Sequence, residues 1–480
     1  MSTKSIKKNY LFNTVYQILS LLTPLLTTPY ISRVLGPEAI GEYSFTSSIV
    51  SYFCLFAVMG SGIYGQREIS YVSNDKEKRS KVFWEVLCIR FVTTSIMLII
   101  YGIFIYVQES RLLYAIQAIT MLTIITDITW LFLGMEEFGK IVMRNVGLKI
   151  ANILFIFIAI HEQEDLWLYV FGMCLFSFIN AIVLWGYLPK YIKPPVLKKL
   201  EIKKHLKPIW LLFIPTIAIQ IYTVLDKTMI GIFAVSSAEN GFYEQALKLS
   251  KIMLTLVTSL GTVVIPRIGF LFADGQKEKV NHLMYRSYQF VWFLGIPIYL
   301  GVVGVAKNMV PWFYGAGYDK VVYLLYILGF LILAIGINNV TGMQYMIPTK
   351  RHNLFTITVC IGAIINFIFN LILIPRFYSI GAAISSVLAE SVIAIVQLYI
   401  VRKEFQIQRI LKLSWNYIIA GSIMLGTLLA IERQLEPSMI NTGILVVCGA
   451  SVYFIILIVL KDSFFIENTN KVFRKKLLKK

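Results

Sequence analysis

The chain has 480 residues, of which 57% are hydrophobic and only 15% are charged. This balance excludes a soluble globular protein, since about 25% of the residues in such proteins are charged. The formal net charge of +19 does not indicate nucleic-acid binding. The basic residues lie in short gaps between apolar stretches, where membrane orientation and anionic lipid headgroups explain them.

Apolar stretches long enough to cross a hydrocarbon core as helices recur along the whole chain. The first of them is too long for the core of a signal peptide and is followed by no clear cleavage site, so we expect it to be retained. The sequence predicts about fourteen spans, at residues 10–31, 42–64, 82–107, 112–133, 146–160, 166–188, 209–235, 242–265, 287–306, 321–343, 354–374, 380–401, 414–431 and 440–460.

Lys and Arg are distributed unevenly among the gaps. Both tails and every second gap together hold about 35 of the 45 basic residues, and the opposite gaps hold about six. This alternation is what the positive-inside rule produces in a chain threaded back and forth through a membrane. It predicts a multi-pass protein of the cytoplasmic membrane, with an even number of spans and both termini in the cytoplasm.

The sequence shows no sign of catalytic machinery. The five cysteines and four histidines are scattered, so neither a disulfide framework nor a metal site is expected. The longest polar gap has about 20 residues, too few for an independent catalytic domain, and there is no P-loop motif. We therefore expect a transporter with no resident cofactor rather than an enzyme.

A short repeat indicates two related halves. Gly41-Glu42-Tyr43 follows the first span and Gly241-Phe242-Tyr243 follows the seventh. Six spans per half would make parallel repeats, as in alternating-access transporters. The prediction is an all-α integral membrane fold with two pseudo-symmetric six-helix lobes. Its parts are an N-terminal lobe at 1–190, a basic cytoplasmic linker at 191–208, a second lobe at 209–405, and two last helices with a basic cytoplasmic tail at 406–480.

Several basic residues lie inside predicted spans, where a charge is costly and faces a cavity or a partner. Arg90 is in the third span, where it could also snorkel or pair with a carboxylate. Lys227 is in the seventh span. Lys248 and Lys251 share one face of the eighth, which suits an anionic group such as a pyrophosphate. Glu244, four residues before Lys248, could instead neutralise it.

Three acidic residues also lie inside predicted spans: Asp127, Asp226 and Glu390. Each could couple transport to a Na⁺ or H⁺ gradient, or could only accept a hydrogen bond from a neighbouring helix. Asp226 cannot pair directly with the adjacent Lys227, because neighbours on a helix point about 100° apart.

Several motifs resemble the bacterial polysaccharide repeat-unit flippases of the multidrug/oligosaccharidyl-lipid/polysaccharide exporter superfamily. They cover the chain from the first span to the eighth. The matching pieces are Pro29-Tyr30, Arg33-Val34-Leu35-Gly36, Gly41-x-Tyr43, DITWLFLGMEEF (127–138), YTVLDKTMIG (222–231), NGFYEQALKL (240–249) and IPRI (265–268).

The resemblance implies two six-helix lobes forming a V, plus two C-terminal helices. It implies that undecaprenyl-pyrophosphate-linked oligosaccharide is moved from the inner to the outer leaflet of a bacterial cytoplasmic membrane for surface polysaccharide synthesis. Membrane lipids and the polymerase and glycosyltransferases of the same pathway would be further partners. Basic residues in the cavity would hold the headgroup, and the candidates are Arg33 at the outer mouth, Arg90, Lys227, Lys248 and Lys251.

Three alternatives stay open. A multidrug or cation antiporter of the same superfamily would favour acidic residues in its cavity, whereas four of the charges inside these spans are basic. A flippase for the peptidoglycan lipid precursor would handle similar headgroup chemistry. A membrane glycosyltransferase or polymerase typically carries a large external loop, which this chain lacks.

Overall fold

A computed structural model describes the backbone of residues 3–196 and 200–477, and side chains from 19 to 470 except 138, 197–199, 214–215, 218–219 and 221–222. Within these ranges every regular element is a helix, which confirms the all-α prediction. The chain divides into two compact units, Met1–Gly241 and Phe242–Lys480.

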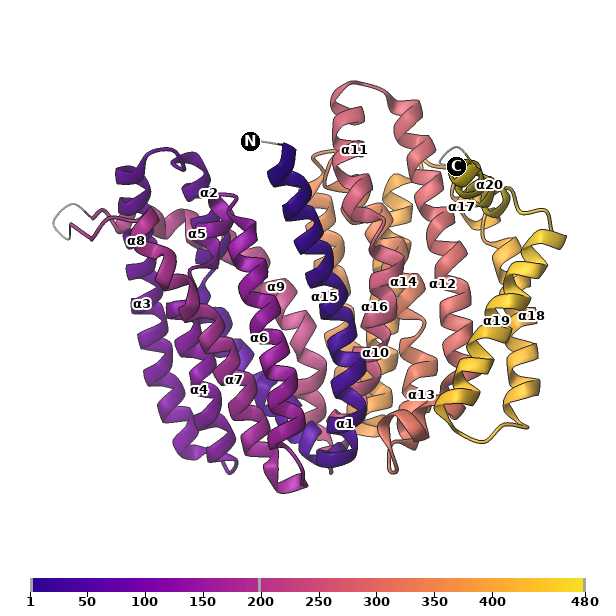
Figure 1. Ribbon diagram of the computed structural model, residues 1–480, viewed down its shortest axis with the longest axis horizontal. Coiled ribbons are helices and arrows are strands. Elements are labelled where there is room, and N and C mark those ends of the chain that lie inside the picture. Colours follow the sequence, from indigo (N-terminus) through magenta and orange to yellow (C-terminus); the bar gives the residue numbers. More distant parts are fainter. Residues whose placement is uncertain (1–2, 197–199, 478–480) are drawn as a thin grey trace. The chain divides into compact units, whose positions relative to one another are not determined.

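Unit 1 is a bundle of long helices joined by short connections. In it α4 packs on α3 and α7, and α7 packs on α6; Figure 1 shows these helices side by side. Its helices are α1 (Thr3–Val58), α2 (Ser61–Tyr71), α3 (Lys76–Val107), α4 (Arg111–Thr126), α5 (Thr129–Gly134), α6 (Phe138–Ala159), η1 (Gln163–Asp165), α7 (Leu166–Val183), η2 (Leu184–Tyr187), α8 (Leu188–Tyr191) and α9 (Lys203–Phe233).

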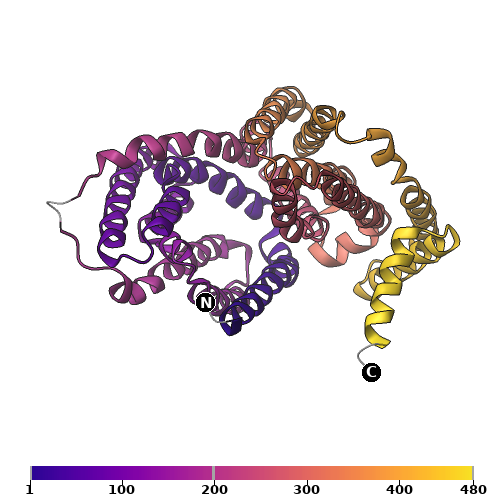
Figure 2. The same cartoon turned by 90° about the horizontal axis from the view of Figure 1, so that it is seen from above.

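Unit 2 begins inside α10 and ends with two helices packed on the long helix α12. The pairs α12–α18, α18–α19 and α15–α16 make its most extensive contacts, and Figure 2 shows the yellow helices α18–α20 grouped together. Its helices are α10 (Ala238–Thr258), α11 (Gly261–Ala273), α12 (Lys277–Tyr314), α13 (Asp319–Leu328), α14 (Leu331–Asn338), the π-helical segment η4 (Asn339–Met346), α15 (His352–Phe377), α16 (Ser379–Val401), α17 (Ile407–Lys412), α18 (Trp415–Glu432), α19 (Met439–Val459) and α20 (Ser463–Leu477).

Apolar side chains cover both the inside and the outside of the helices. On α19, Leu445 and Leu457 are fully buried, whereas Val447 and Val459 are 65% and 69% exposed. Large apolar groups on an outer face are expected when that face meets lipid rather than water. The protein is therefore a multi-pass membrane protein.

Eleven of the described helices are long and apolar enough to span a membrane, and twelve if α10 and α11, bent by 40°, form one span. The predicted number of about fourteen is not confirmed. The first two predicted spans fall in a single helical run, Leu19–Tyr71. The seventh lies in α9, where several side chains are outside the described residues.

The run that holds the first two spans is broken at Gly36. Gly36 has φ 73° and ψ 172°, a conformation open to glycine but not to residues with a side chain. Pro37 follows and has no backbone N–H to donate. The chain therefore turns at the expected end of the first span, although the helix is nearly continuous there.

The division between the units falls after Gly241, not at the expected linker 191–208. The reason is that α9 packs along α1. The Thr228 hydroxyl is 2.9 Å from the Ser48 hydroxyl and 3.1 Å from that of Tyr52. By its contacts, the seventh predicted span belongs with the first six.

The two glycines of the repeated motif meet each other. A Cβ on Gly41 would lie 1.8 Å from the Ser237 carbonyl oxygen and 2.9 Å from the Gly241 nitrogen. A Cβ on Gly241 would lie 2.0 Å from the Pro37 carbonyl oxygen. Both positions therefore require glycine, because only hydrogen fits between the two backbones.

The basic gaps of unit 1 gather at one end of the bundle. The Arg79 guanidinium donates to the Tyr191 carbonyl at 2.7 Å, and Lys193 pairs with Glu77 at 2.7 Å. In Figure 1 the short helices α2, α5 and α8 lie at this end. These gaps were predicted to share one side of the membrane, and their contacts agree. That this side is cytoplasmic stays a prediction.

The basic gaps of unit 2 are joined in a similar way. Arg286 pairs with Glu467 of α20 at 3.1 Å, and Arg351 pairs with Glu404 at 2.6 Å. The helix α20 reaches residue 477, so the basic tail begins as a helix. Its side chains beyond 470 lie outside the described residues.

Candidate functional site

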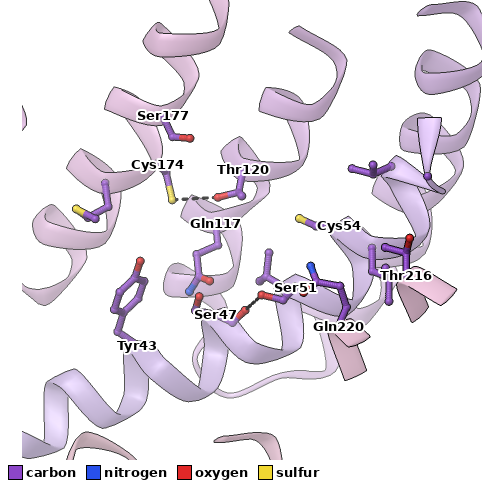
Figure 3. A pocket seen from close by; sticks show the side chains of 15 residues that line it. Tyr43, Ser47, Ser51, Cys54, Gln117, Thr120, Cys174, Ser177, Thr216 and Gln220 are labelled. Carbon is purple, nitrogen blue, oxygen red and sulfur yellow. Dashed lines mark hydrogen bonds between the residues drawn. The ribbon is translucent and has the colours of Figure 1, made fainter. Parts of the chain in front are cut away.

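Unit 1 contains a polar cavity of about 430 Å³, which we call the hydroxyl pocket (Figure 3). None of the described residues that line it carries a charge. Its lining is made of hydroxyl, amide, thiol and apolar groups. The lining residues are Tyr43, Ser47, Val50, Ser51, Cys54, Leu55, Val58, Gly60, Gln117, Thr120, Met173, Cys174, Ser177, Thr216 and Gln220.

Helical spacing brings these side chains to the pocket. The residues from α1 recur every three or four positions, as at Tyr43, Ser47, Ser51 and Val58, so they share one face of that helix. The other helices each contribute residues spaced in the same way: Gln117 and Thr120 on α4, Met173, Cys174 and Ser177 on α7, and Thr216 and Gln220 on α9. The second half of α1 therefore forms one wall, with α4, α7 and α9 around it.

Several lining hydroxyls are held by their own helices. The Ser51 hydroxyl donates to the Ser47 carbonyl at 2.7 Å, and the Thr216 hydroxyl donates to the Leu212 carbonyl at 2.9 Å. These bonds satisfy the O–H groups within the helix. The lone pairs of the same oxygens remain able to accept hydrogen bonds from a ligand.

Bonds between helices fix two further groups. The Thr120 hydroxyl lies 3.3 Å from the Cys174 sulfur, as drawn in Figure 3. The buried Gln117 side chain donates one of its two Nε2 hydrogens to the Thr46 hydroxyl at 2.7 Å, which orients the amide. These bonds hold two of the lining side chains in place.

A second cavity of about 430 Å³ adjoins the first, since Met173 and Ser177 line both. We call it the basic pocket, because Arg144 and Lys149 of α6 line it. The Lys149 ammonium donates to the Ser20 hydroxyl at 2.9 Å, and Arg144 donates to the Asn145 side-chain oxygen at 2.9 Å. The other lining residues are Thr123, Asp127, Thr129, Asn145, Leu148, Asn152, Phe176, Asn180 and Ala181.

The structure buries Arg90 among backbone groups. Only 4% of this residue is exposed. Its guanidinium donates to the Ser61 hydroxyl at 2.8 Å and to the Asp127 carbonyl at 2.7 Å, and lies 5.7 Å from the centre of the Trp130 ring. It therefore holds the C-terminal end of α4, where carbonyl groups lack helical partners. It is absent from the described lining of both pockets.

The other predicted cavity cations lie on both units. Arg33 is exposed, shortly before the break at Gly36, and the half-buried Lys227 lies on α9. Lys248 and Lys251 lie one turn apart on the part of α10 that belongs to unit 2, the former half-buried and the latter exposed. Their shared face is as predicted, and their role as cavity cations stays a prediction.

The three predicted acids have different surroundings. Asp127 ends α4, accepts from the Thr129 backbone N–H at 2.9 Å, and lines the basic pocket. Asp226 is buried on α9. Glu390 of α16 accepts a hydrogen bond from the side-chain nitrogen of Asn338, which joins α14 to α16. Coupling to an ion gradient stays a prediction for all three.

Most residues of the two pockets were not among the predicted site residues, with Asp127 of the basic pocket as the exception. Arg144 precedes the predicted fifth span, 146–160, and Lys149 lies near its start, whereas α6 begins at Phe138 and both residues line the basic pocket. The hydroxyl residues of α1 were passed over because they are uncharged. A signal was present: polar residues recur at helical spacing within an apolar span.

Comparison with known proteins gives consistent matches. The profile of a family described as "Polysaccharide biosynthesis protein" matches residues 6–272. A "Putative O-antigen transporter" of Escherichia coli (strain K12) is 24% identical over 83% of this chain and 97% of its own length. The "Capsular polysaccharide biosynthesis protein CapF" of Staphylococcus aureus is 25% identical over 83% of this chain and 100% of its own length.

Solved structures share the fold at low identity. The structure titled "Lipid II flippase MurJ, inward closed conformation" has a TM-score of 0.75 and 17% identity, covering 94% of this chain and 99% of its own. An inward-facing multidrug resistance transporter of the MATE family has a TM-score of 0.61 and 15% identity, covering 82% and 95%. At these identities the likeness shows the architecture only.

Proposed function

The chain belongs to the polysaccharide biosynthesis protein family, and from this premise we propose that it is a flippase for lipid-linked oligosaccharides. It would move undecaprenyl-pyrophosphate-linked repeat units from the inner to the outer leaflet of the cytoplasmic membrane by alternating access. Relatives described as an O-antigen transporter and a capsular polysaccharide biosynthesis protein support this assignment.

The observation that carries the proposal is the pair of polar cavities inside an apolar helical bundle. An oligosaccharide joined to a pyrophosphate is polar and anionic, and it cannot enter hydrocarbon without losing its hydration. Polar walls replace part of that hydration and lower the barrier. The lipid tail can stay in the bilayer, against the apolar outer faces of the helices.

The cations carry the electrostatic part of the proposal. Lys248 and Lys251 of unit 2 would meet the pyrophosphate as point charges. Arg33 and Lys227 of unit 1 are the further candidate cations. Arg90 would act indirectly, since its guanidinium holds the end of α4. Asp127, Asp226 and Glu390 are the candidates for coupling to Na⁺ or H⁺. Both termini would lie in the cytoplasm, and the glycosyltransferases and polymerase of the pathway would be partners.

A cation antiporter is less well supported by this site. A cationic drug would need an acidic partner in a cavity of low polarity. Asp127 lines the basic pocket, where Arg144 and Lys149 are also present, and the described lining of the hydroxyl pocket has no carboxylate.

The first experiment is deletion of the gene in its native host, followed by extraction of lipid-linked sugars and assignment of their leaflet. We expect undecaprenyl-linked repeat units to accumulate on the cytoplasmic side and surface polysaccharide to be lost. An unchanged lipid-linked pool together with reduced drug efflux would favour the antiporter instead. Accumulation of the peptidoglycan precursor would assign the protein to that pathway.

The second experiment restores the deletion strain with the variant K248A/K251A. We expect surface polysaccharide to remain absent while the variant still inserts into the membrane. The matched control is K277A/K279A, which removes two exposed lysines from the start of α12, and it should restore the polysaccharide. Full activity of K248A/K251A would contradict the role of this lysine pair.

A further inference from the structure

We propose that unit 1 itself contains a saccharide site. In this site the hydroxyl pocket binds a neutral sugar ring of the transported glycan, and the adjoining basic pocket binds an acidic group attached to it. This site rests on the proposed function and adds to it the place where the sugar is bound and recognised. It does not involve the lysine pair of α10.

The chemistry of the hydroxyl pocket matches a neutral carbohydrate. A sugar presents many hydroxyl groups and no charge, and each hydroxyl can donate and accept. The described lining offers hydroxyls and amides from four helices, with no charged side chain. A volume of about 430 Å³ lies within the range of small-molecule sites, about 300–1,000 Å³.

The arrangement of donors indicates how a sugar would be held. The O–H groups of Ser51 and Thr216 already donate to carbonyls of their own helices. Their oxygens are therefore left as acceptors for sugar hydroxyls, and so is the side-chain oxygen of Gln117, whose nitrogen donates to Thr46. A pocket of pre-oriented acceptors loses little entropy on binding.

Aromatic and apolar groups complete the pocket. Tyr43 stands on the wall formed by α1 (Figure 3) and is packed edge-on against Tyr169, with ring centroids 5.6 Å apart. A rigid ring of this kind gives a flat surface for the C–H face of a pyranose. Met173 and Val50 add further apolar contact.

The basic pocket places cations next to the sugar. Ser177 and Met173 line both cavities, so a ligand filling one reaches the edge of the other. Arg144 and Lys149 can hold an oxyanion by charge-assisted hydrogen bonds. The acidic group could be the phosphate of the lipid carrier or the carboxylate of an acidic sugar, which share this chemistry.

The test compares two double variants that remove the same groups in different places. S51A/T120V deletes one serine and one threonine hydroxyl from the hydroxyl pocket. T427V/S451A deletes one of each from α18 and α19, at the half-buried Thr427 and the exposed Ser451. There each hydroxyl bonds a carbonyl of its own helix, as that of Ser51 does. K149Q removes a cation from the basic pocket.

The probes come from the host strain that lacks the gene. One is the lipid-linked glycan that accumulates there, and the other is bare undecaprenyl phosphate. Binding of each to protein in lipid nanodiscs is measured by native mass spectrometry. We expect S51A/T120V to weaken binding of the glycan-bearing lipid about tenfold, with binding of the bare lipid unchanged. T427V/S451A should match the wild type with both probes.

The K149Q arm identifies the acidic group. Weaker binding of both probes assigns the lipid phosphate to the basic pocket, whereas weaker binding of the glycan-bearing lipid alone assigns an acidic sugar. If neither binding changes, the basic pocket has no such role.

The remaining outcomes separate this inference from the proposed function. If S51A/T120V binds the glycan-bearing lipid like the wild type, the sugar site is wrong while the flippase assignment stands. If no lipid-linked glycan accumulates in the deletion strain, the proposed function fails, and the saccharide site fails with it.

Discussion

Two polar regions of unit 1 differ in what their polar groups face. The first is the Glu85 cluster, in which the Glu85 carboxylate is fully buried. This carboxylate lies 2.7 Å from the His205 Nε2 and 2.7 Å from the Glu201 backbone nitrogen. The Lys204 ammonium is 3.2 Å away. The Tyr64 hydroxyl closes the other side of the imidazole, 2.6 Å from Nδ1. In the second, the hydroxyl pocket, polar side chains line a cavity instead.

Polar groups inside this membrane protein therefore have two different roles. In the Glu85 cluster, protein groups from α2, α3 and α9 satisfy a buried charge, so the cluster joins helices far apart in sequence. In the hydroxyl pocket, the oxygens that remain as acceptors face a space that a ligand can fill. A ligand should therefore depend on the pocket, and the fold should depend on the cluster.

The largest effect is expected from E85A, which removes the centre of the cluster. The buried His205 imidazole and the Glu201 backbone N–H would lose their acceptor, at a cost of about 1–3 kcal/mol for each group left unsatisfied. Thermal unfolding of the detergent-solubilised protein, followed by fluorescence-detected size exclusion, measures the loss. The control E77A lies on the same helix, where Glu77 pairs with Lys193 on the surface, and should cost at most about 1 kcal/mol.

The E85A variant also tests whether the Glu85 cluster serves the fold alone. Should E85A keep wild-type stability but lose transport, the cluster would belong to the transport mechanism, and the distinction between the two regions would be lost. Y64F, which removes a single hydroxyl, should give a smaller loss of stability than E85A.

A second prediction concerns the meeting of α1 with the turn before α10. G41A would place a methyl group 1.8 Å from the Ser237 carbonyl oxygen, and backbone atoms cannot move aside as a flexible side chain would. We expect a loss of about 3 kcal/mol, at the upper end of overpacking costs. The control is G102A on α3, where a Cβ meets nothing within 4 Å. Equal unfolding temperatures for the two variants would show that the glycine contact is not tight.

Arg90 is expected to behave like the Glu85 cluster, as a residue on which the fold depends. R90K keeps the charge but not the geometry that reaches both the Ser61 hydroxyl and the Asp127 carbonyl. Leaving such a buried group without its partner costs about 1–3 kcal/mol. We expect lower thermal stability, with unchanged affinity for undecaprenyl phosphate in the protein that remains folded. If R90K has a normal unfolding temperature but binds the lipid more weakly, Arg90 acts as a cavity cation that binds the headgroup.

The helices themselves could be predicted from the sequence, because the thickness of the bilayer fixes the length of each apolar stretch. The same reasoning located Arg90 and Asp127 inside spans. It could not show that the Arg90 guanidinium reaches the carbonyl of Asp127, 37 positions away. That contact depends on how α3 packs against the end of α4, which hydropathy does not encode.

The candidate site was harder to predict for a related reason. A charged residue inside an apolar span indicates a partner or a cavity. Serine and threonine do not, because their hydroxyls can bond to their own helix. Ser47 and Ser51 become informative only when α4, α7 and α9 are placed around them. The assignment of α9 to unit 1 likewise rests on contacts such as Ser48 with Thr228, which no single sequence reveals.

The smallest effect is expected at the exposed edge of the Glu85 cluster. The Lys204 and Lys81 ammonium groups, 2.9 Å and 3.0 Å from the Glu201 carboxylate, lower its pKa from an ordinary 4.5 to about 2. Because the pKa is depressed in the folded state, this pairing stabilises the fold above pH 4.5 and is lost as the pH falls from 4.5 towards 2. E201Q should therefore unfold at a slightly lower temperature than the wild type at pH 7, and the difference should shrink with acid and with salt. A difference that persists at low pH or in high salt would mean that the side chain of Glu201 stabilises the fold by something other than its charge, and pairing with Lys204 and Lys81 would then not be the cause.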